Sequence, residues 1–323
     1  MLAYCALNQL KSSLRALYTR KFSFIGQEIW YPSSRSELDL IDKSYEDCVS
    51  RLGASYPGYD DSSYMKWLKN TRNIDQSVDA DVTDIVYPSD TYQTWKILYA
   101  RLRELHLECA CEEHKENLRE LEQLGIYSPE KIPQFSLVNK YLNYKTGFKL
   151  VPCGGMINPR SFLYGLAYKI FYSSRYIRHQ SAVFYSPEPD VAHELMGHVP
   201  LFANNDFAEL SQSIGLRSLG ATEEEIEKLA KIYFYSVEFG IVGNQILGAG
   251  ILGSCDEIAL IKNKKVEIKE WDLEKVLKSE FTLSDYQPGY YSAESLLEMK
   301  RLIKEGIDFI RPMQPLKRIP VYL

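Results

Sequence analysis

Asp190-Val-Ala-His-Glu-Leu-Met-Gly-His198 is the stretch from which the rest of this sequence is best understood. It contains two of the five histidines in the chain, His193 and His198. Farther along, one carboxylate, Glu238, lies inside the apolar run 232–240. Histidine is the commonest metal ligand in proteins. A carboxylate among aromatic side chains is costly unless a metal or an arginine lies nearby or the group points to solvent. Two imidazoles and one carboxylate would form a metal site; two ordinary helix-end histidines are the alternative.

The spacing of the histidines argues against the zinc peptidase signature H-E-x-x-H, whose histidines are four residues apart on one helical face. Here they are five residues apart, which is about 140° around an ideal α-helix at about 100° per residue. Both can reach one ion only if the helix ends or bends between them, and Gly197 and Pro200 favour such a break. Two histidines and one carboxylate leave coordination positions open, as in non-haem Fe(II) oxygenases. On ligand type alone, zinc with a bound water is the alternative.

The composition excludes several classes of protein. With 323 residues, 45% hydrophobic and 25% charged, the chain is predicted to be globular. A net charge of -5 and the lack of a basic stripe argue against a nucleic-acid partner. The six cysteines form no CxxC pair, and no run approaches the roughly 18 apolar residues of a membrane span. We expect free thiols, a cytoplasmic location, and neither a nucleic-acid nor a membrane partner.

Helical patterns dominate the chain, and the predicted helices cover 36–52, 89–125, 158–170 and 223–239. Asn158-Pro159 is a typical helix start, and Thr222-Glu-Glu-Glu225 is a capping box. Strand patterns are short, at 265–268 and 320–323. We therefore expect a mainly α (α+β) fold, with an amphipathic extension at 1–23 and a single domain at 24–323.

Several co-linear stretches closely resemble the catalytic domain of the pterin-dependent aromatic amino acid hydroxylases, the family of phenylalanine, tyrosine and tryptophan hydroxylases. These stretches are TGFKL (146–150), YIRH (176–179), SPEPDVAHELMGHVPLF (186–202), SIGLRSLGA (213–221), KLAKIYFYSVEFG (228–240) and YQPGYYSAES (286–295). The similarity runs from about Trp30 to the C-terminus. It implies a basket-like helical catalytic domain with a few short strands, which binds Fe(II) and uses O2 and a tetrahydropterin as cosubstrates to hydroxylate an aromatic ring.

The resemblance also implies roles for individual residues. His193, His198 and Glu238 match the iron ligands. Glu194 matches a carboxylate near the pterin and an iron-bound water, and Tyr233 matches a tyrosine close to the iron. Residues matching the pterin-binding segment are Phe162, whose ring would stack on the pterin, and Gly155 and Ile157.

On the substrate side, Arg178 matches the arginine that binds the amino acid carboxylate. Its guanidinium suits a bidentate carboxylate contact, although an arginine paired with an aspartate is often only structural. Tyr87 matches a mobile loop tyrosine over the site. The other residues that match the substrate side are Ser186, Pro189, Asp190, Phe234, Gly253 and Ser254.

The substrate itself is left open by the resemblance. At position 234 this chain has Phe, which resembles the tryptophan hydroxylases, because the phenylalanine and tyrosine hydroxylases usually carry Trp at that position. At position 292 it has Ser, which matches none of the three kinds of hydroxylase. We expect a pocket that accepts Phe and Trp, with Tyr as a third candidate. The alternatives are a dedicated tryptophan 5-hydroxylase or phenylalanine 4-hydroxylase and, more remotely, a zinc hydrolase or an inactive binding homologue. Iron and pterin would activate O2 together, while the protein positions the substrate and excludes water.

Departures from the family pattern lead to two further expectations. Gly253-Ser254 stands where many members have two adjacent serines, which predicts the loss of a hydrogen bond to a ligand histidine and a lower activity or metal affinity. Cys153 and Pro159 lie in the pterin segment and leave the natural pterin open. The sequence matches neither the regulatory domain nor the tetramerising helix of the animal enzymes, so we expect a monomer without allosteric activation.

Overall fold

The computed structural model of the chain describes residues 29–74, 76–282 and 286–312, and the structural statements below concern these residues. The described residues from Tyr31 onward belong to one compact unit. The predicted extension at 1–23 and the predicted strand at 320–323 lie outside the described residues.

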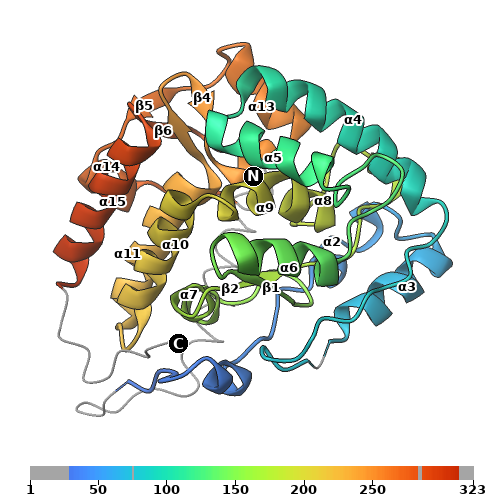
Figure 1. The fold of residues 1–323 in the computed structure, drawn as a ribbon, viewed down its shortest axis with the longest axis horizontal. Coiled ribbons are helices and arrows are strands. Elements are labelled where there is room, and N and C mark those ends of the chain that lie inside the picture. The colour runs from blue at the N-terminus through green and yellow to red at the C-terminus, as the bar shows by residue number, and fades with distance from the viewer. Residues whose placement is uncertain (1–28, 75, 283–285, 313–323) are drawn as a thin grey trace. The chain divides into compact units, whose positions relative to one another are not determined.

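The unit that begins at Tyr31 is built mainly from helices, as Figure 1 shows, so the prediction of a mainly α fold is confirmed. The α-helices are α2 (Cys48–Leu52), α3 (Ser62–Arg72), α4 (Thr91–Cys109), α5 (Glu112–Gln123), α6 (Phe135–Lys145), α7 (Pro159–Ala167), α8 (Val191–His193), α9 (Val199–Phe202), α10 (Asn205–Ser218), α11 (Glu223–Tyr233), α12 (Ala249–Leu252), α13 (Cys255–Lys262), α14 (Leu273–Lys278) and α15 (Leu296–Ile310). Three short 3-10 helices are η1 (Ser36–Leu40), η2 (Gly53–Ser55) and η3 (Gln180–Ala182), and two π-helical turns are η4 (Glu194–His198) and η5 (Phe234–Glu238). None of the described helices is long and apolar enough to cross a membrane.

The strands form two small sheets. In the first, β1 (Lys149–Pro152) and β2 (Ile170–Ser173) are parallel, and α7 is the connection between them. The second has the order β4-β3-β6-β5, with β3 (Gly240–Val242), β4 (Gln245–Ile246), β5 (Ile268–Glu270) and β6 (Tyr290–Ala293). Only its β3–β4 pair is antiparallel. The predicted strand at 265–268 therefore overlaps β5 only at Ile268. The sequence patterns missed the other strands of the described chain.

The predicted helix starts are confirmed. The Asn158 side chain accepts a hydrogen bond from the Ser161 N–H, and Thr222 forms the capping box with Glu225. The predicted end of the first of these helices is wrong, because α7 stops at Ala167 and Ile170 already belongs to β2. Lys169, at φ +57°, turns the chain between the two elements.

Two predicted helices are interrupted. The pattern over 89–125 divides into α4 and α5 because the Cys111 N–H leaves the helix and donates to the Ile246 carbonyl at 2.9 Å. The pattern over 36–52 is helical only in η1 and α2, since Tyr45 between them pairs with Ile157 as an isolated β-bridge. Both interruptions are long-range contacts that a local pattern does not contain.

The segment that carries the histidines lies in the hydrophobic core. The side chains of Val191, Leu195, Val199 and Phe202 are 0% exposed. α5 packs on α9, and α12 packs on η4 and on η5. The approach of α12 is close, since a Cβ atom on Gly197 would lie 2.4 Å from the Ala249 carbonyl oxygen. A side chain at position 197 would collide with α12, so packing requires glycine there.

Candidate metal centre

The two histidines are separated by a π-helical turn. Within η4 the Val199 N–H donates to the Glu194 carbonyl, five residues earlier. This wider winding places residues five apart close to one face. The prediction that the helix ends or bends between His193 and His198 is therefore wrong in detail, because the helix continues through this point with a different register. Glu238 ends a second π-helical turn, η5, in the last turn of the predicted helix over 223–239.

Together the two π turns bring the three predicted ligands to one point. The Nε2 atoms of His193 and His198 are 3.0 Å apart, and the Glu238 carboxylate oxygens lie 3.8 Å and 3.2 Å from them. Atoms that bind one ion at about 2.1 Å lie about 3 Å apart when their bonds are perpendicular. Two ring nitrogens this close repel unless a proton or a cation lies between them. The donor set therefore fits a single first-row metal ion.

Glu194 is a second carboxylate at this point. His193, Glu194 and His198 each offer a ligand atom, all within 4.8 Å of one another. Glu194 Oε1 accepts hydrogen bonds from the Ser174 N–H at 3.1 Å and from the Ser174 hydroxyl at 3.2 Å. Burial raises the pKa of Glu194 to about 8. Ser174, just after β2, was missed by the sequence analysis, because only the fold brings β2 next to η4.

Glu238 keeps its charge in spite of its burial. Burial raises the pKa of Glu238, but His198, His193 and Tyr233 outweigh it, so the pKa is lowered from its usual value. Burial and the nearby Glu238 raise the pKa of the Tyr233 hydroxyl well above its usual value. The Phe162 ring lies edge-on to Tyr233 with 5.0 Å between centroids. The predicted pterin-stacking ring therefore contacts Tyr233, which lies beside Glu238, a predicted metal ligand.

Arg178 and Asp190 form a buried pair beside His193. The Arg178 Nε and Nη2 atoms donate to the two Asp190 oxygens at 2.8 Å and 2.7 Å. Burial raises the pKa of Asp190, but Arg178 outweighs it, so the pKa is lowered. Asp190 also caps α8 by accepting from the His193 N–H. The pair is thus a structural link to the first ligand as well as a candidate carboxylate-binding group.

The other predicted substrate residues serve different local roles. The Ser186 hydroxyl donates to the Glu188 carbonyl at 2.6 Å, and Ser254 caps α13 by accepting from the Glu257 N–H. The Pro189 carbonyl accepts from the hydroxyl groups of Ser174 and Tyr176. Of these contacts, the one through Ser174 leads to the candidate metal centre, because the Ser174 hydroxyl also lies 3.2 Å from Glu194 Oε1.

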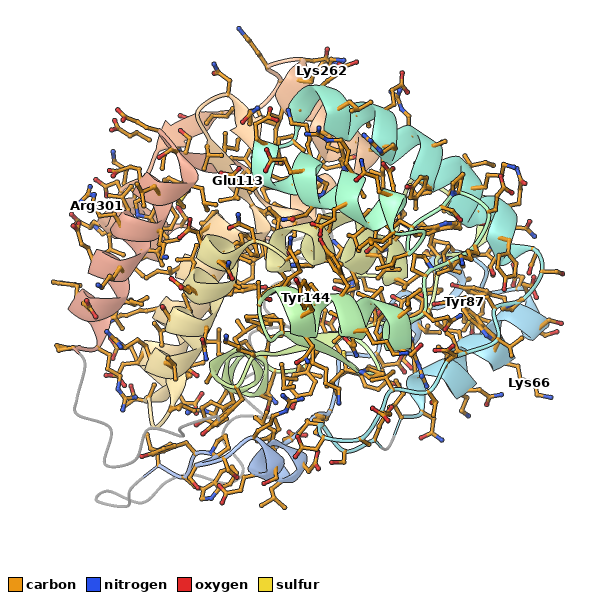
Figure 2. All side chains as sticks on the ribbon, in the orientation of Figure 1. Lys66, Tyr87, Glu113, Tyr144, Lys262 and Arg301 are labelled. Carbon is orange, nitrogen blue, oxygen red and sulfur yellow. The ribbon has the colours of Figure 1, made fainter. Side chains whose placement is uncertain are left out.

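Phe234 lies in a group of aromatic rings. It stacks on Phe281 at 4.1 Å between centroids and lies tilted against Phe239 at 4.5 Å. Tyr87 is buried; its hydroxyl donates to the Arg175 carbonyl, and its ring contacts Trp67 of α3. Figure 2 labels Tyr87 on the side of the molecule where α3 lies, with the exposed Lys66 of the same helix pointing outward. In this conformation the Tyr87 hydroxyl is held by the backbone of Arg175, the residue after Ser174.

The predicted pterin segment is covered by Tyr45. A Cβ atom on Gly155 would lie 3.0 Å from the Tyr45 ring and 3.6 Å from Glu188 Oε2. Ile157 pairs with Tyr45 through the isolated bridge. Glu188 in turn forms a buried ion pair with Arg72 of α3. Sequence analysis missed the pair, although a charged residue between two prolines in the best-matched motif was a usable signal.

Gly253 packs directly against the first ligand. A Cβ atom there would lie 2.9 Å from both Cα and Nδ1 of His193. Among the described residues, His193 Nδ1 makes no hydrogen bond. Position 253 therefore offers no hydroxyl to His193, and there is little room for a serine side chain at this position.

Comparison with known proteins places this geometry in a family. The model of the family described as biopterin-dependent aromatic amino acid hydroxylase matches residues 29–315. The chain belongs to this family. It is 38% identical to phenylalanine-4-hydroxylase of Bos taurus over 85% of the chain and 62% of the relative, and 36% identical to tyrosine 3-monooxygenase of Caenorhabditis briggsae over 88% and 56%. The chain thus spans about three fifths of the length of these curated relatives.

Solved hydroxylase structures share the fold. The apo phenylalanine hydroxylase from Colwellia psychrerythraea 34H matches with a TM-score of 0.65 and 30% identity, over 70% of this chain and 87% of the other. A Chromobacterium violaceum phenylalanine hydroxylase with bound iron(III) and oxidized cofactor 7,8-dihydrobiopterin matches with a TM-score of 0.64 and 27% identity, over 82% and 92%. The biopterin-dependent hydroxylase fold predicted from the sequence motifs is therefore confirmed.

Proposed function

We propose that this protein is a pterin-dependent aromatic amino acid monooxygenase in which His193, His198 and Glu238 hold Fe(II). The observation that carries the proposal is the convergence of three donor groups from two π-helical turns on one buried point, in a chain of this family. Bound Fe(II), with a tetrahydropterin as electron donor, would supply the activation of O2.

The chain's own residues would bind and orient the pterin and the substrate, and they would exclude water. Glu194 is held by Ser174 beside the ligands and is mostly protonated at neutral pH in the protein alone, since its pKa is raised to about 8. It can therefore donate a hydrogen bond to a ligand of the iron or to the pterin. Phe162 offers a ring face for the pterin, with Gly155 and Ile157 in the same segment. Tyr233 closes the space between Phe162 and Glu238.

The substrate would bind through its carboxylate and its ring. Arg178 carries more donors than its two bonds to Asp190 use, so it can still bind an amino acid carboxylate. Phe234, which packs against Phe239 and Phe281, and Pro189 would line the aromatic pocket. We propose that Phe and Trp are both accepted, with Tyr as a third candidate. A preference for one of them by more than about a thousandfold in kcat/KM would contradict a permissive pocket.

The deciding experiment is an anaerobic Fe(II) reconstitution followed by O2-consuming turnover. Phe, Tyr and Trp are compared with and without a tetrahydropterin, in the wild type and in His198→Ala. We expect hydroxylated product only when iron, pterin and an intact His198 are all present. Iron binding without any pterin-dependent product would contradict the proposed activity. Zinc-dependent hydrolysis of peptides or amides would favour the alternative of a zinc hydrolase.

The expectation of a monomer is tested separately by sedimentation velocity, in which a tetramer would contradict it. The net charge of -5 is in keeping with a small-molecule substrate rather than a nucleic-acid partner.

A further inference from the structure

Three buried side chains outside the predicted site donate hydrogen bonds to the backbone of the metal-binding segment. The Tyr127 hydroxyl donates to the Leu195 carbonyl at 2.7 Å, His114 Nε2 lies 2.7 Å from the Met196 carbonyl oxygen, and Asn117 Nδ2 donates to the Pro200 carbonyl at 2.9 Å. We call Tyr127, His114 and Asn117 the carbonyl clamp. They are 2%, 0% and 8% exposed, so water does not compete for these bonds.

Each of the three carbonyls has lost its ordinary helical donor. In an α-helix the Leu195 carbonyl would accept from the Val199 N–H, but Val199 donates to Glu194 in the π register. In the π register it would accept from residue 200, which is a proline and has no N–H. In the observed π register the Leu195 carbonyl is therefore without a backbone donor, whereas the α register would give it the Val199 N–H.

Met196 and Pro200 are affected in similar ways. The α-helical donor for the Met196 carbonyl would again be residue 200, so Pro200 removes it. The Pro200 carbonyl would accept from the Asn204 N–H, which donates to Leu201 at 2.9 Å instead. A buried carbonyl without a donor costs about 1–3 kcal/mol, so three such groups would strongly disfavour this turn.

The clamp residues are held rigidly in place. His114 and Asn117 lie one turn apart on the same face of α5, which packs on α9 (Figure 1). A carbonyl can only accept, so His114 is the Nε2–H tautomer, and burial lowers its pKa well below the usual value. Its ring lies edge-on against His106, 4.6 Å between centroids. His106 Nε2 lies 2.7 Å from the carbonyl of Leu252, the residue before Gly253.

We propose that Tyr127, His114 and Asn117 are positioning residues that maintain the π register of the ligand turn and so keep His193 and His198 on one face for the metal. The inference rests on the proposed metal centre. Without Tyr127 the Leu195 carbonyl is paired again only if Val199 returns to it, so the turn shifts toward the α register. Without His114 or Asn117 a further carbonyl of the same turn loses its donor, and the turn is held less firmly. In the α register side chains five apart diverge by about 140°. The metal affinity and the metal's coordination geometry then change together.

The test uses Co(II) on the full chain, because its visible absorption reports coordination geometry and a competition titration gives its Kd. The variants are Tyr127→Phe and His114→Phe, which remove donors, and His114→Gln, which keeps an N–H donor. The matched controls are Tyr141→Phe and Asn139→Ala. Their side chains make the same kinds of bond elsewhere, to Glu120 and to the Leu150 carbonyl.

We expect Tyr127→Phe and His114→Phe to raise the Co(II) Kd by about 10- to 100-fold and to change the absorption spectrum. His114→Gln should restore much of the affinity, and both controls should lose some stability but keep the wild-type Kd and spectrum. If His114→Phe does not fold, Tyr127→Phe, which removes one oxygen atom, decides the matter.

Two results would overturn the inference, and they can be told apart. If the clamp variants lose stability but bind Co(II) like the wild type, the clamp is only structural and the proposed metal centre stands. If the wild type itself binds no Co(II), the metal centre is wrong and the clamp's role is wrong with it.

Discussion

Asp190 joins the Arg178 guanidinium to the backbone of His193. Its two oxygens accept three hydrogen bonds from Arg178, at 2.7, 2.8 and 2.9 Å, and a fourth from the His193 N–H at 3.2 Å. One buried carboxylate therefore fixes both the candidate substrate arginine and the start of the ligand turn. A substitution at Asp190 therefore affects both the Arg178 side chain and the His193 backbone.

Asp190→Asn keeps the shape of this side chain but leaves the buried Arg178 charge without a counter-charge. We expect it to lower the free energy of unfolding by about 3–5 kcal/mol, measured by urea denaturation. Asp308→Asn removes a half-exposed carboxylate from Arg217 and should cost less than about 1 kcal/mol. Equal losses in the two variants would contradict the role given to Asp190.

The buried Arg72–Glu188 pair holds α3 against the loop before Asp190. Both side chains are almost completely buried, at 4% and 1% exposed. Arg72→Met or Glu188→Met alone should cost about 3–5 kcal/mol, because each leaves a buried charge unpaired. The double variant should cost much less than the sum of the two. Additive losses in a double-mutant cycle of urea denaturation would show that the two charges do not act as a pair.

Glu257 predicts a pH dependence of stability that lies away from the metal centre. It accepts from the Tyr290 hydroxyl at 2.8 Å, and burial raises its pKa from the ordinary 4.5 to about 7. The folded protein therefore binds this proton more tightly than the unfolded chain. Its contribution to stability is fully present below about pH 4.5 and is lost as the pH rises toward 7.

Glu257→Gln removes the ionisation and keeps an acceptor for Tyr290. We expect the variant to be more stable than the wild type at pH 8, by on the order of 2 kcal/mol, and to show a flatter profile from pH 5 to 7. Thermal unfolding across this range is the measurement. The exposed Glu227→Gln is the control and should follow the wild type. An unchanged slope in Glu257→Gln would mean that Glu257 is ionised in the folded protein.

Gly253 predicts a steric limit at the first ligand. Gly253→Ala and Gly253→Ser place a Cβ atom 2.9 Å from His193 Cα and Nδ1, so either the ligand or α12 must move. We expect a loss of Fe(II) or Co(II) affinity of about tenfold or more, even for serine. Gly289→Ala is the control, because its new Cβ would lie 3.6 Å from its nearest neighbour. A gain in affinity with serine would show that α12 has room to accommodate a hydroxyl.

The sequence alone was sufficient to predict the local features of this protein. The three candidate ligand side chains could be named from it, and the caps at Asn158 and Thr222 and the mainly helical content could be predicted, because each depends on neighbouring residues or on a shared family motif. The comparisons confirm the family and the fold.

Only the tertiary structure decided how the ligands meet. The five-residue spacing of His193 and His198 indicated a distortion but not its kind, because the π register is stable only when donors from elsewhere replace those that Pro200 removes. These donors are far from Pro200 in the sequence. In the same way, the contact that divides α4 from α5 joins Cys111 to the distant Ile246. The physical reason is common to all of them. A buried carbonyl or carboxylate must have a partner, and the sequence states the need without saying which distant residue the fold will bring to meet it.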